Sequence, residues 1–286
     1  MASTSEGLIM LLKDVLRNKR LVGSAILMLA IVFVAVFPGL IAPHEPYEQN
    51  LRNRYQPPEL SLAVESRYRL GTDRLGRDIL SRTIHAARIS VFVGLASVFI
   101  GGTVGVSLGV IGGYYRGPLD VIIMRLADIQ LAVPPLLLVV ALVGVLGASL
   151  TNVIMVLAIS SWVVYARTAR SLVLSLREGV FVEAVRALGA RDLRILAKHV
   201  LPNVVVPIVV IGTQQMAHMI IRESSLSFLG IGVPIHVPTW GAMISEGRGV
   251  ITRAWWVSVV PGVALLCTVL VLNFLGDGVR DTLSKR

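Results

Sequence analysis

Charged residues and cysteine are both scarce in this chain. Of its 286 residues, 15% are Asp, Glu, Lys or Arg, 55% belong to the apolar set and one is cysteine. Soluble globular proteins carry about 25% charged residues, so this chain has too little charge to cover its apolar surface in water. A single cysteine excludes an internal disulfide framework and a cysteine-based zinc site. The composition therefore indicates a protein that lies in a lipid bilayer.

The charge that is present has one dominant sign. Lys and Arg number 27 against 17 Asp and Glu, which gives a net charge of +10. A nucleic-acid-binding protein would gather this charge on a water-exposed face, whereas here the basic residues flank long apolar runs. Basic flanks are typical of the cytoplasmic ends of membrane spans. Most of them fall on the side of the N-terminal segment, so we expect both termini to be cytoplasmic.

Six apolar runs are long enough to cross a bilayer. A helix rises 1.5 Å per residue, so about 20 residues cross roughly 30 Å of hydrocarbon. The predicted fold is an all-α integral membrane protein with six transmembrane helices. The runs are residues 21–42, 89–111, 121–145, 150–168, 203–224 and 257–276.

The segments around these runs predict the domain organisation. Residues 1–20 carry leucines at helical spacing among basic residues, typical of a cytoplasmic amphipathic helix or of an extension of the first span. The first run is too long for a secretory signal, and we expect an uncleaved helix. Residues 43–88 would form an extracytoplasmic segment, 89–276 a five-helix core and 277–286 a cytoplasmic tail.

Glycine and proline shape two of the spans. Gly101, Gly105 and Gly109 recur at every fourth position, a spacing that permits close helix packing. Pro134-Pro135 should kink the third span, because proline removes a backbone donor and clashes with the preceding turn. Near the start of that span Arg125 and Asp128 are three residues apart, and we expect them to form an ion pair.

The polar segment 178–203 carries the pattern of two short amphipathic helices, which we call the elbow. Apolar residues recur at helical spacing over 180–188, and Gly189 follows where a left-handed C-terminal cap is expected. Asp192 is placed to cap a second helix, whose apolar side includes Leu193 and Val200 and which ends at Pro202. Without further information such an elbow is also typical of a loop that rests on the lipid interface.

The spacing within the elbow resembles the EAA loop of permease subunits in ATP-binding-cassette (ABC) importers. Glu183-Ala184 is followed six residues after the glutamate by Gly189, and later by Leu201-Pro202. Two positions depart from the general form, since Val185 replaces a small residue and His199 stands where isoleucine is usual. Four further stretches are similar to dipeptide, oligopeptide and nickel importer permeases, most of all to the dipeptide or oligopeptide permease C type: 71–82, 225–232, 238–241 and 273–281.

The resemblance implies a type I ABC importer permease in the bacterial inner membrane. Its partners would be a homologous permease, two ATPase subunits and an extracytoplasmic substrate-binding protein, with ATP and Mg on the ATPases and no cofactor on this chain. The implied cargo is a di- or oligopeptide, and nickel or another small solute is the alternative. The residues implied to couple with the ATPase are Glu183, Ala184, Ala187, Leu188, Gly189, Arg191, Asp192, Leu201 and Pro202.

Motifs of an ATPase or another enzyme are missing from the sequence. A P-loop requires G-x-x-x-x-G-K-[ST], and none of the four lysines precedes Ser or Thr. No nucleophile lies beside a plausible base, and the five histidines show no ligand spacing, so we expect neither a catalytic nor a metal site. An ion-driven secondary transporter is a further alternative, disfavoured because no inverted repeat is visible.

A polar stripe marks the fifth span. Gln214, His218 and Arg222 are four residues apart and so share one side of a helix, with Gln215 beside them. Polar groups inside a membrane usually face a bundle interior or a water-filled cavity. We expect this stripe to line the translocation path, and a polar seam against the partner permease is the alternative. Glu223 would neutralise Arg222, which leaves Gln214 and His218 as the better path residues.

Overall fold

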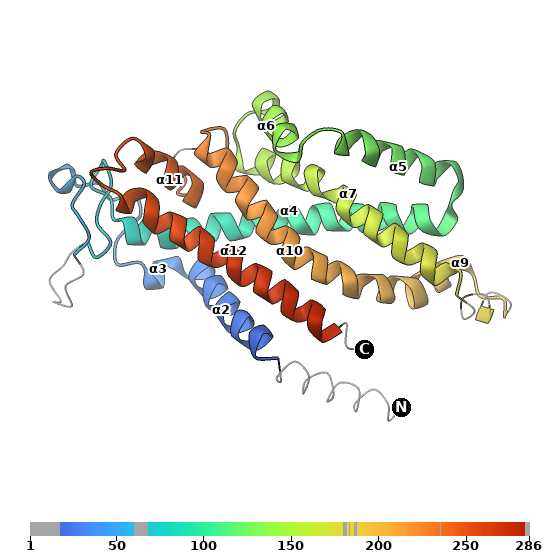
Figure 1. The fold of residues 1–286 in the computed structure, drawn as a ribbon. Helices are drawn as coiled ribbons and strands as arrows, with labels where there is room; N and C mark the ends of the chain where they lie inside the picture. Colours follow the sequence, from blue (N-terminus) through green and yellow to red (C-terminus); the bar gives the residue numbers. More distant parts are fainter. Residues whose placement is uncertain are drawn as a thin grey trace.

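The computed structural model describes residues 18–59, 68–179, 182, 184–185, 188–234 and 236–283. Within these residues the structure is helical, and the β contact is limited to an isolated bridge between Thr72 and Asp78. The helices, labelled in Figure 1, are α2 (Lys19–Val36), α3 (Pro38–Ile41), the 3-10 turn η1 (Leu51–Asn53), α4 (Ile79–Tyr115), α5 (Gly117–Leu131), α6 (Pro135–Leu146), α7 (Leu150–Arg177), α9 (Asp192–Ile195), the π-helical turn η2 (Leu196–Val200), α10 (Leu201–Phe228), α11 (Trp240–Arg248) and α12 (Trp256–Leu283).

The centre of the bundle is the contact between α4 and α7. A Cβ added at Gly101, Gly105 or Gly109 of α4 would lie 2.8, 2.3 or 2.2 Å from the backbone oxygen of Ala158, Trp162 or Ala166 of α7, respectively. A side chain at these positions would therefore push the two helices apart, and the predicted role of the glycines in close packing is confirmed. The residue numbers of the contacting positions increase by four on both helices, so α4 and α7 run parallel.

Because α4 and α7 run parallel, the chain that joins them through α5 and α6 has to reverse direction. Since α7 begins at the same end of the bundle as α4, the chain between them must return along the bundle. The α5–α6 pair makes this return, and the two helices are bent by 90° at a short break before Pro135. By length and composition, five of the described helices could cross a membrane, and the number is six when this bent pair is counted as one broken span. The predicted kink is thus a full break.

Ion pairs tie α5 to α7. Arg170 donates to both carboxylate oxygens of Asp120, with 2.6 Å between Nη2 and Oδ2, and Arg167 pairs with Asp128. The expected pair of Arg125 with Asp128 is wrong, because Arg167 approaches from the neighbouring helix and takes that carboxylate. Pairing across two helices fixes how the broken span packs on α7.

The end of the bundle opposite the elbow is closed by a buried ion cluster. Asp73 accepts hydrogen bonds from Arg77 and Arg82, each at 2.6 Å, and both arginines also reach Glu246 of α11. Asp73 and Arg82 are 0 and 2% exposed, so the carboxylates and guanidinium groups neutralise one another in a buried site. Trp256 Nε1 donates to Thr72 O at 3.0 Å. The ion cluster and the Trp256 hydrogen bond therefore attach the loop before α4 to α11 and α12.

The first and last long helices lie along one flank of the bundle (Figure 1). Asn18, at the start of α2, donates to Gly278 O and Thr282 Oγ1 near the end of α12, both at 3.3 Å. These two helix ends therefore lie on the same side of the molecule. α2 stops at Val36, earlier than the predicted 42, because Phe37 leaves helical geometry before the short helix α3.

Candidate functional site

The elbow follows α7 and leads into α9 at one end of the bundle, next to the end of α4 (Figure 1). Among the residues expected to couple with the ATPase, the structure describes Ala184, Leu188, Gly189, Arg191, Asp192, Leu201 and Pro202. Glu183 and Ala187, as well as Val180 and Phe181 of the predicted apolar stripe, lie outside the described residues.

Gly189 ends the first half of the elbow. Its φ of +82° lies in the left-handed region, as predicted for the C-terminal cap. Leu188 N donates to Ala184 O at 3.1 Å and Ala190 N to Val185 O at 3.3 Å, so the preceding turn is closed by backbone hydrogen bonds. A residue with a Cβ would be strained here, because L-residues other than Gly rarely hold this conformation.

The apolar side of the elbow differs from the predicted stripes. Ile195 and Val200 are fully buried and Val182 is 5% exposed, and they pack with Tyr114 of α4 and Val173 of α7. Leu188 and Leu193, in contrast, are 87% and 76% exposed. The prediction that Leu193 and Val200 share the apolar side is wrong, because α9 continues into a wider π-helical turn that changes which residues face the bundle.

One of the exposed leucines, Leu193, lies among basic side chains. A shallow pocket beside Leu193 is lined by Gly189, Arg191, Leu193, Arg194, Ala197 and Lys198. Arg191, Arg194 and Lys198 are all exposed. This part of the elbow thus presents Leu193 and Ala197 beside positive charge, a surface that suits an acidic or mixed-charge protein partner.

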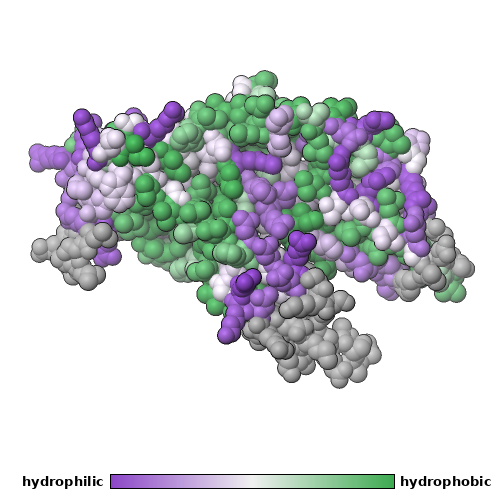
Figure 2. Space-filling view, in the orientation of Figure 1, coloured by the Kyte–Doolittle hydropathy of each residue, from purple (hydrophilic) through white to green (hydrophobic). Residues whose placement is uncertain are grey.

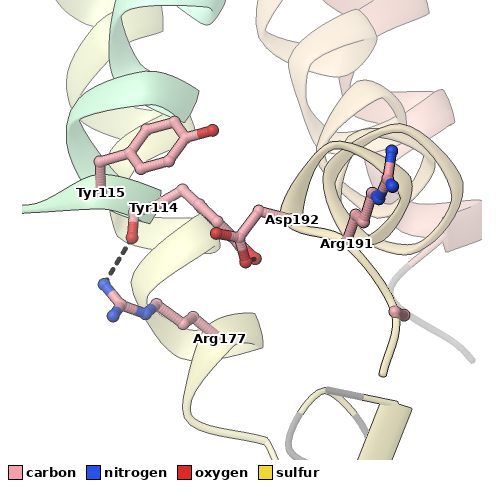
Figure 3. A pocket seen from close by; sticks show the side chains of 6 residues that line it. Tyr114, Tyr115, Arg177, Arg191 and Asp192 are labelled. Atoms are coloured by element: carbon pink, nitrogen blue, oxygen red, sulfur yellow. Dashed lines mark hydrogen bonds between the residues drawn. The ribbon is translucent and has the colours of Figure 1, made fainter. Parts of the chain in front are cut away.

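Asp192 connects the elbow to the bundle. The N-cap residue is Arg191 and Asp192 is the first helical residue, so the predicted cap position of Asp192 is wrong. Its Oδ1 accepts instead from Tyr114 Oη at 2.6 Å, and Tyr114 is 2% exposed. Arg177 donates to Tyr114 O and lies over the Tyr114 ring at 5.7 Å (Figure 3). Three helices meet at this tyrosine.

Pro202 does not end a helix, contrary to the prediction. α9, η2 and α10 form one continuous helical run, Asp192–Phe228. A proline in an α-helix clashes with the carbonyl four residues earlier; here Leu201 N bonds back to Leu196 O, five residues away, which widens the turn. Asn203 Nδ2 donates to His199 O at 2.6 Å and satisfies a carbonyl near the proline. The second half of the elbow is therefore continuous with α10.

The polar stripe of the fifth span lies on α10 as predicted. His218 is exposed and Gln214 and Arg222 are half-buried, whereas Gln215 is 7% exposed and packs inside the bundle. Figure 2 shows hydrophilic side chains over the middle of this face of the molecule, between two apolar areas. The exposed His218 side chain shows that the stripe reaches the surface of this chain.

Glu223 does not neutralise Arg222, contrary to the prediction. It is 0% exposed and accepts from Ser227 Oγ at 2.7 Å and from Ser90 and Ser224 Oγ at 3.3 Å. Neighbours on a helix point about 100° apart, and the glutamate turns toward α4 while Arg222 turns toward α7. The serine-rich run 224–227 was the signal for this buried carboxylate that the sequence analysis did not use.

Comparisons with known proteins decide the family. Residues 105–286 match the family described as binding-protein-dependent transport system inner membrane component, and residues 10–58 match the N-terminal TM domain of oligopeptide transport permease C. The chain belongs to this family of inner-membrane transport components. It is a multi-pass inner-membrane permease subunit, and membership in a transport family confirms the prediction of a permease rather than an enzyme.

Individual relatives agree with this assignment. The chain is 42% identical to the Di/tripeptide transport system permease protein DppC of Pseudomonas aeruginosa, over 94% of this chain and 89% of the relative. It is 40% identical to the Glutathione transport system permease protein GsiD of Escherichia coli, over 92% and 85%. The resemblance to peptide importer permeases that the sequence predicts is thus confirmed.

A solved structure of a transporter shares the fold. A chain of the inward-facing MetNI methionine ABC transporter superposes with a TM-score of 0.61 at 21% identity, covering 71% of this chain and 97% of that chain. At this identity the likeness concerns the fold alone. It confirms the predicted helical fold of a type I importer permease.

Proposed function

We propose that this chain is a permease subunit of an ATP-driven importer of di- and oligopeptides. The observation that carries the proposal is the 42% identity, over 94% of this chain, to a permease named for di- and tripeptide transport. Glutathione, the cargo named for a relative at 40% identity, is itself a short peptide derivative, so both names favour peptide chemistry over nickel.

The complex would contain a homologous permease, two ATPase subunits and an extracytoplasmic substrate-binding protein. Membership in a binding-protein-dependent transport family supports the binding-protein partner. ATP and Mg would be bound by the ATPase subunits, since this chain has no P-loop lysine. The face of α10 that carries His218 would meet the second permease across the translocation path, with Gln214 and Arg222 on the same side.

The elbow would be the surface that the ATPase binds. Leu188 and Leu193 are exposed in a chain whose other elbow residues, Ile195 and Val200, are packed inside. Exposed leucines in a basic, water-facing segment are costly without a partner. Because the elbow is continuous with α10 and joined to α4 through Asp192 and Tyr114, a rotation imposed on it would tilt the helices beside the path.

The elbow and both termini would face the cytoplasm, with the loop before α4 outside. Basic residues are concentrated in the elbow and beside the start of α2, which supports this orientation. The division into a 1–20 N-terminal segment, a first helix, an outer segment at 43–88, a five-helix core and a short tail follows from the same orientation.

The test is uptake by the purified complex of this chain with its partner permease and ATPases in lipid vesicles. With binding protein outside and ATP inside, labelled L-alanyl-L-alanine should accumulate, and accumulation should stop when ATP is replaced by ADP. Glutathione and Ni²⁺ are assayed in parallel. Uptake of Ni²⁺ without peptide uptake would contradict the peptide proposal, and peptide uptake driven by an ion gradient without ATP would contradict the importer class.

A further inference from the structure

Arg222 is a cation within a membrane span that no carboxylate of the described residues neutralises. It lies six residues before the end of α10, about 9 Å along the helix axis. Its Nη1 donates to Ser160 Oγ of α7 at 3.1 Å, and Ser160 Oγ donates in turn to Leu157 O at 2.7 Å. Ser160 is therefore a neutral acceptor that holds the guanidinium in place and leaves its charge uncompensated.

The nearest carboxylate along the chain is committed elsewhere. Glu223 is fully buried, and three serine hydroxyl groups donate to it. Turning it toward Arg222 would break these hydrogen bonds and leave buried hydroxyl groups without an acceptor. The positive charge of Arg222 is thus a lasting property of this face of α10.

The setting of Arg222 suits a small, mobile anion. Guanidinium carries five N–H donors in a planar fork, and Ser160 occupies one of them in the structure. His218, one turn away, is exposed, so the face is open to water or ligand. An unpaired charge in a span usually marks a substrate pathway, because it costs several kcal/mol when it faces lipid.

We propose that Arg222 binds the C-terminal carboxylate of the peptide as it crosses the permease. This inference rests on the proposed function. The N–H groups that Ser160 does not occupy can donate charge-assisted hydrogen bonds to a carboxylate. Every unmodified short peptide has this carboxylate whatever its side chains, so a terminus-binding group allows many sequences to pass. Partial exposure keeps the interaction weak enough for release, as a transport path requires.

The experiment compares two probes in the reconstituted complex, L-alanyl-L-alanine and its C-terminal amide, each at saturating loaded binding protein. Arg222→Gln should lower uptake of the free acid by about tenfold, the effect of losing a charge-assisted hydrogen bond, and change uptake of the amide less than twofold. Arg222→Lys keeps the charge and should retain most free-acid uptake. Arg248→Gln is the matched control: it removes an arginine that lies over the Phe228 ring at the end of α10, and should affect neither probe.

Equal loss of acid and amide uptake in Arg222→Gln, or no loss of either, would overturn the proposal. If the parent complex does not transport the amide, the comparison is made on the free acid alone, where rescue by lysine supports the proposal and failure of lysine to rescue overturns it. Loss of complex assembly in Arg222→Gln on a sizing column would instead show that Arg222 holds the subunits together, and also overturns the proposal. If the parent transports no peptide, the proposed function itself fails, which separates the two results.

Discussion

Arg116 has a backbone conformation that suits a side chain poorly. Between α4 and α5 it has φ 58° and ψ −157°, a region that is essentially restricted to glycine and costs about 1–3 kcal/mol for other residues. Its ion pair with Glu178 joins side chains that are 45% and 69% exposed, and such surface pairs contribute about 0–1 kcal/mol. The strain therefore outweighs the contact.

We expect Arg116→Gly to unfold at a higher temperature than Arg116→Ala in detergent, by a difference of about 1 kcal/mol in unfolding free energy. Both variants lose the ion pair, but Ala keeps the strained Cβ. The greater flexibility of glycine in the unfolded chain works against this gain by about 0.5–1 kcal/mol, which keeps the difference small. Equal midpoints for the two variants would show that the backbone at this position is not strained.

At the scale of elements, the elbow has one side that holds the fold and one that is free. Ile195, Val200 and the Tyr114–Asp192 hydrogen bond attach it to the bundle, whereas Leu188 and Leu193 point away.

Changing both exposed leucines to serine should leave the unfolding midpoint nearly unchanged, since they contribute little to packing within this chain. If they are buried by the ATPase, each contributes roughly 1.5–3 kcal/mol to binding, so ATPase affinity should fall at least about tenfold.

The measurement is titration of the permease pair with its ATPase subunits, followed by ATP hydrolysis of the assembled complex. Leu51→Ser is the matched control, because Leu51 is 62% exposed in the loop before α4 at the other end of the molecule. Unchanged affinity in the double leucine variant would exclude these two leucines as the ATPase contact.

At the scale of the whole molecule, hydropathy predicts the spans well and their ends poorly. The predicted start of α7 at residue 150 is where the helix begins, because an apolar run starts there after a turn. α4, predicted from 89, begins ten residues earlier at Ile79, since Arg82 lies in the buried ion cluster instead of in lipid or water. Glu246 joins that cluster from 164 residues along the chain, and Asp192 meets Tyr114 across 78. No local pattern encodes such pairings.

The orientation of the whole molecule leads to the last prediction. Asn18 donates to Gly278 O and Thr282 Oγ1, so the start of α2 and the end of α12 lie on one side of the bundle. From there α2 leads the chain to the loop that contains Arg54. In a Cys267→Ser background, a cysteine at Arg54 should react with a membrane-impermeant maleimide in intact spheroplasts. Cysteines at Lys19 and Arg280 should react only after permeabilisation, because basic flanks stay cytoplasmic. All four positions, Cys267 included, are exposed, so access and not burial decides the result. Reaction of Lys19 and Arg280 from outside would invert the orientation, and reaction of Lys19 and Arg54 from the same side would remove α2 from the set of spans.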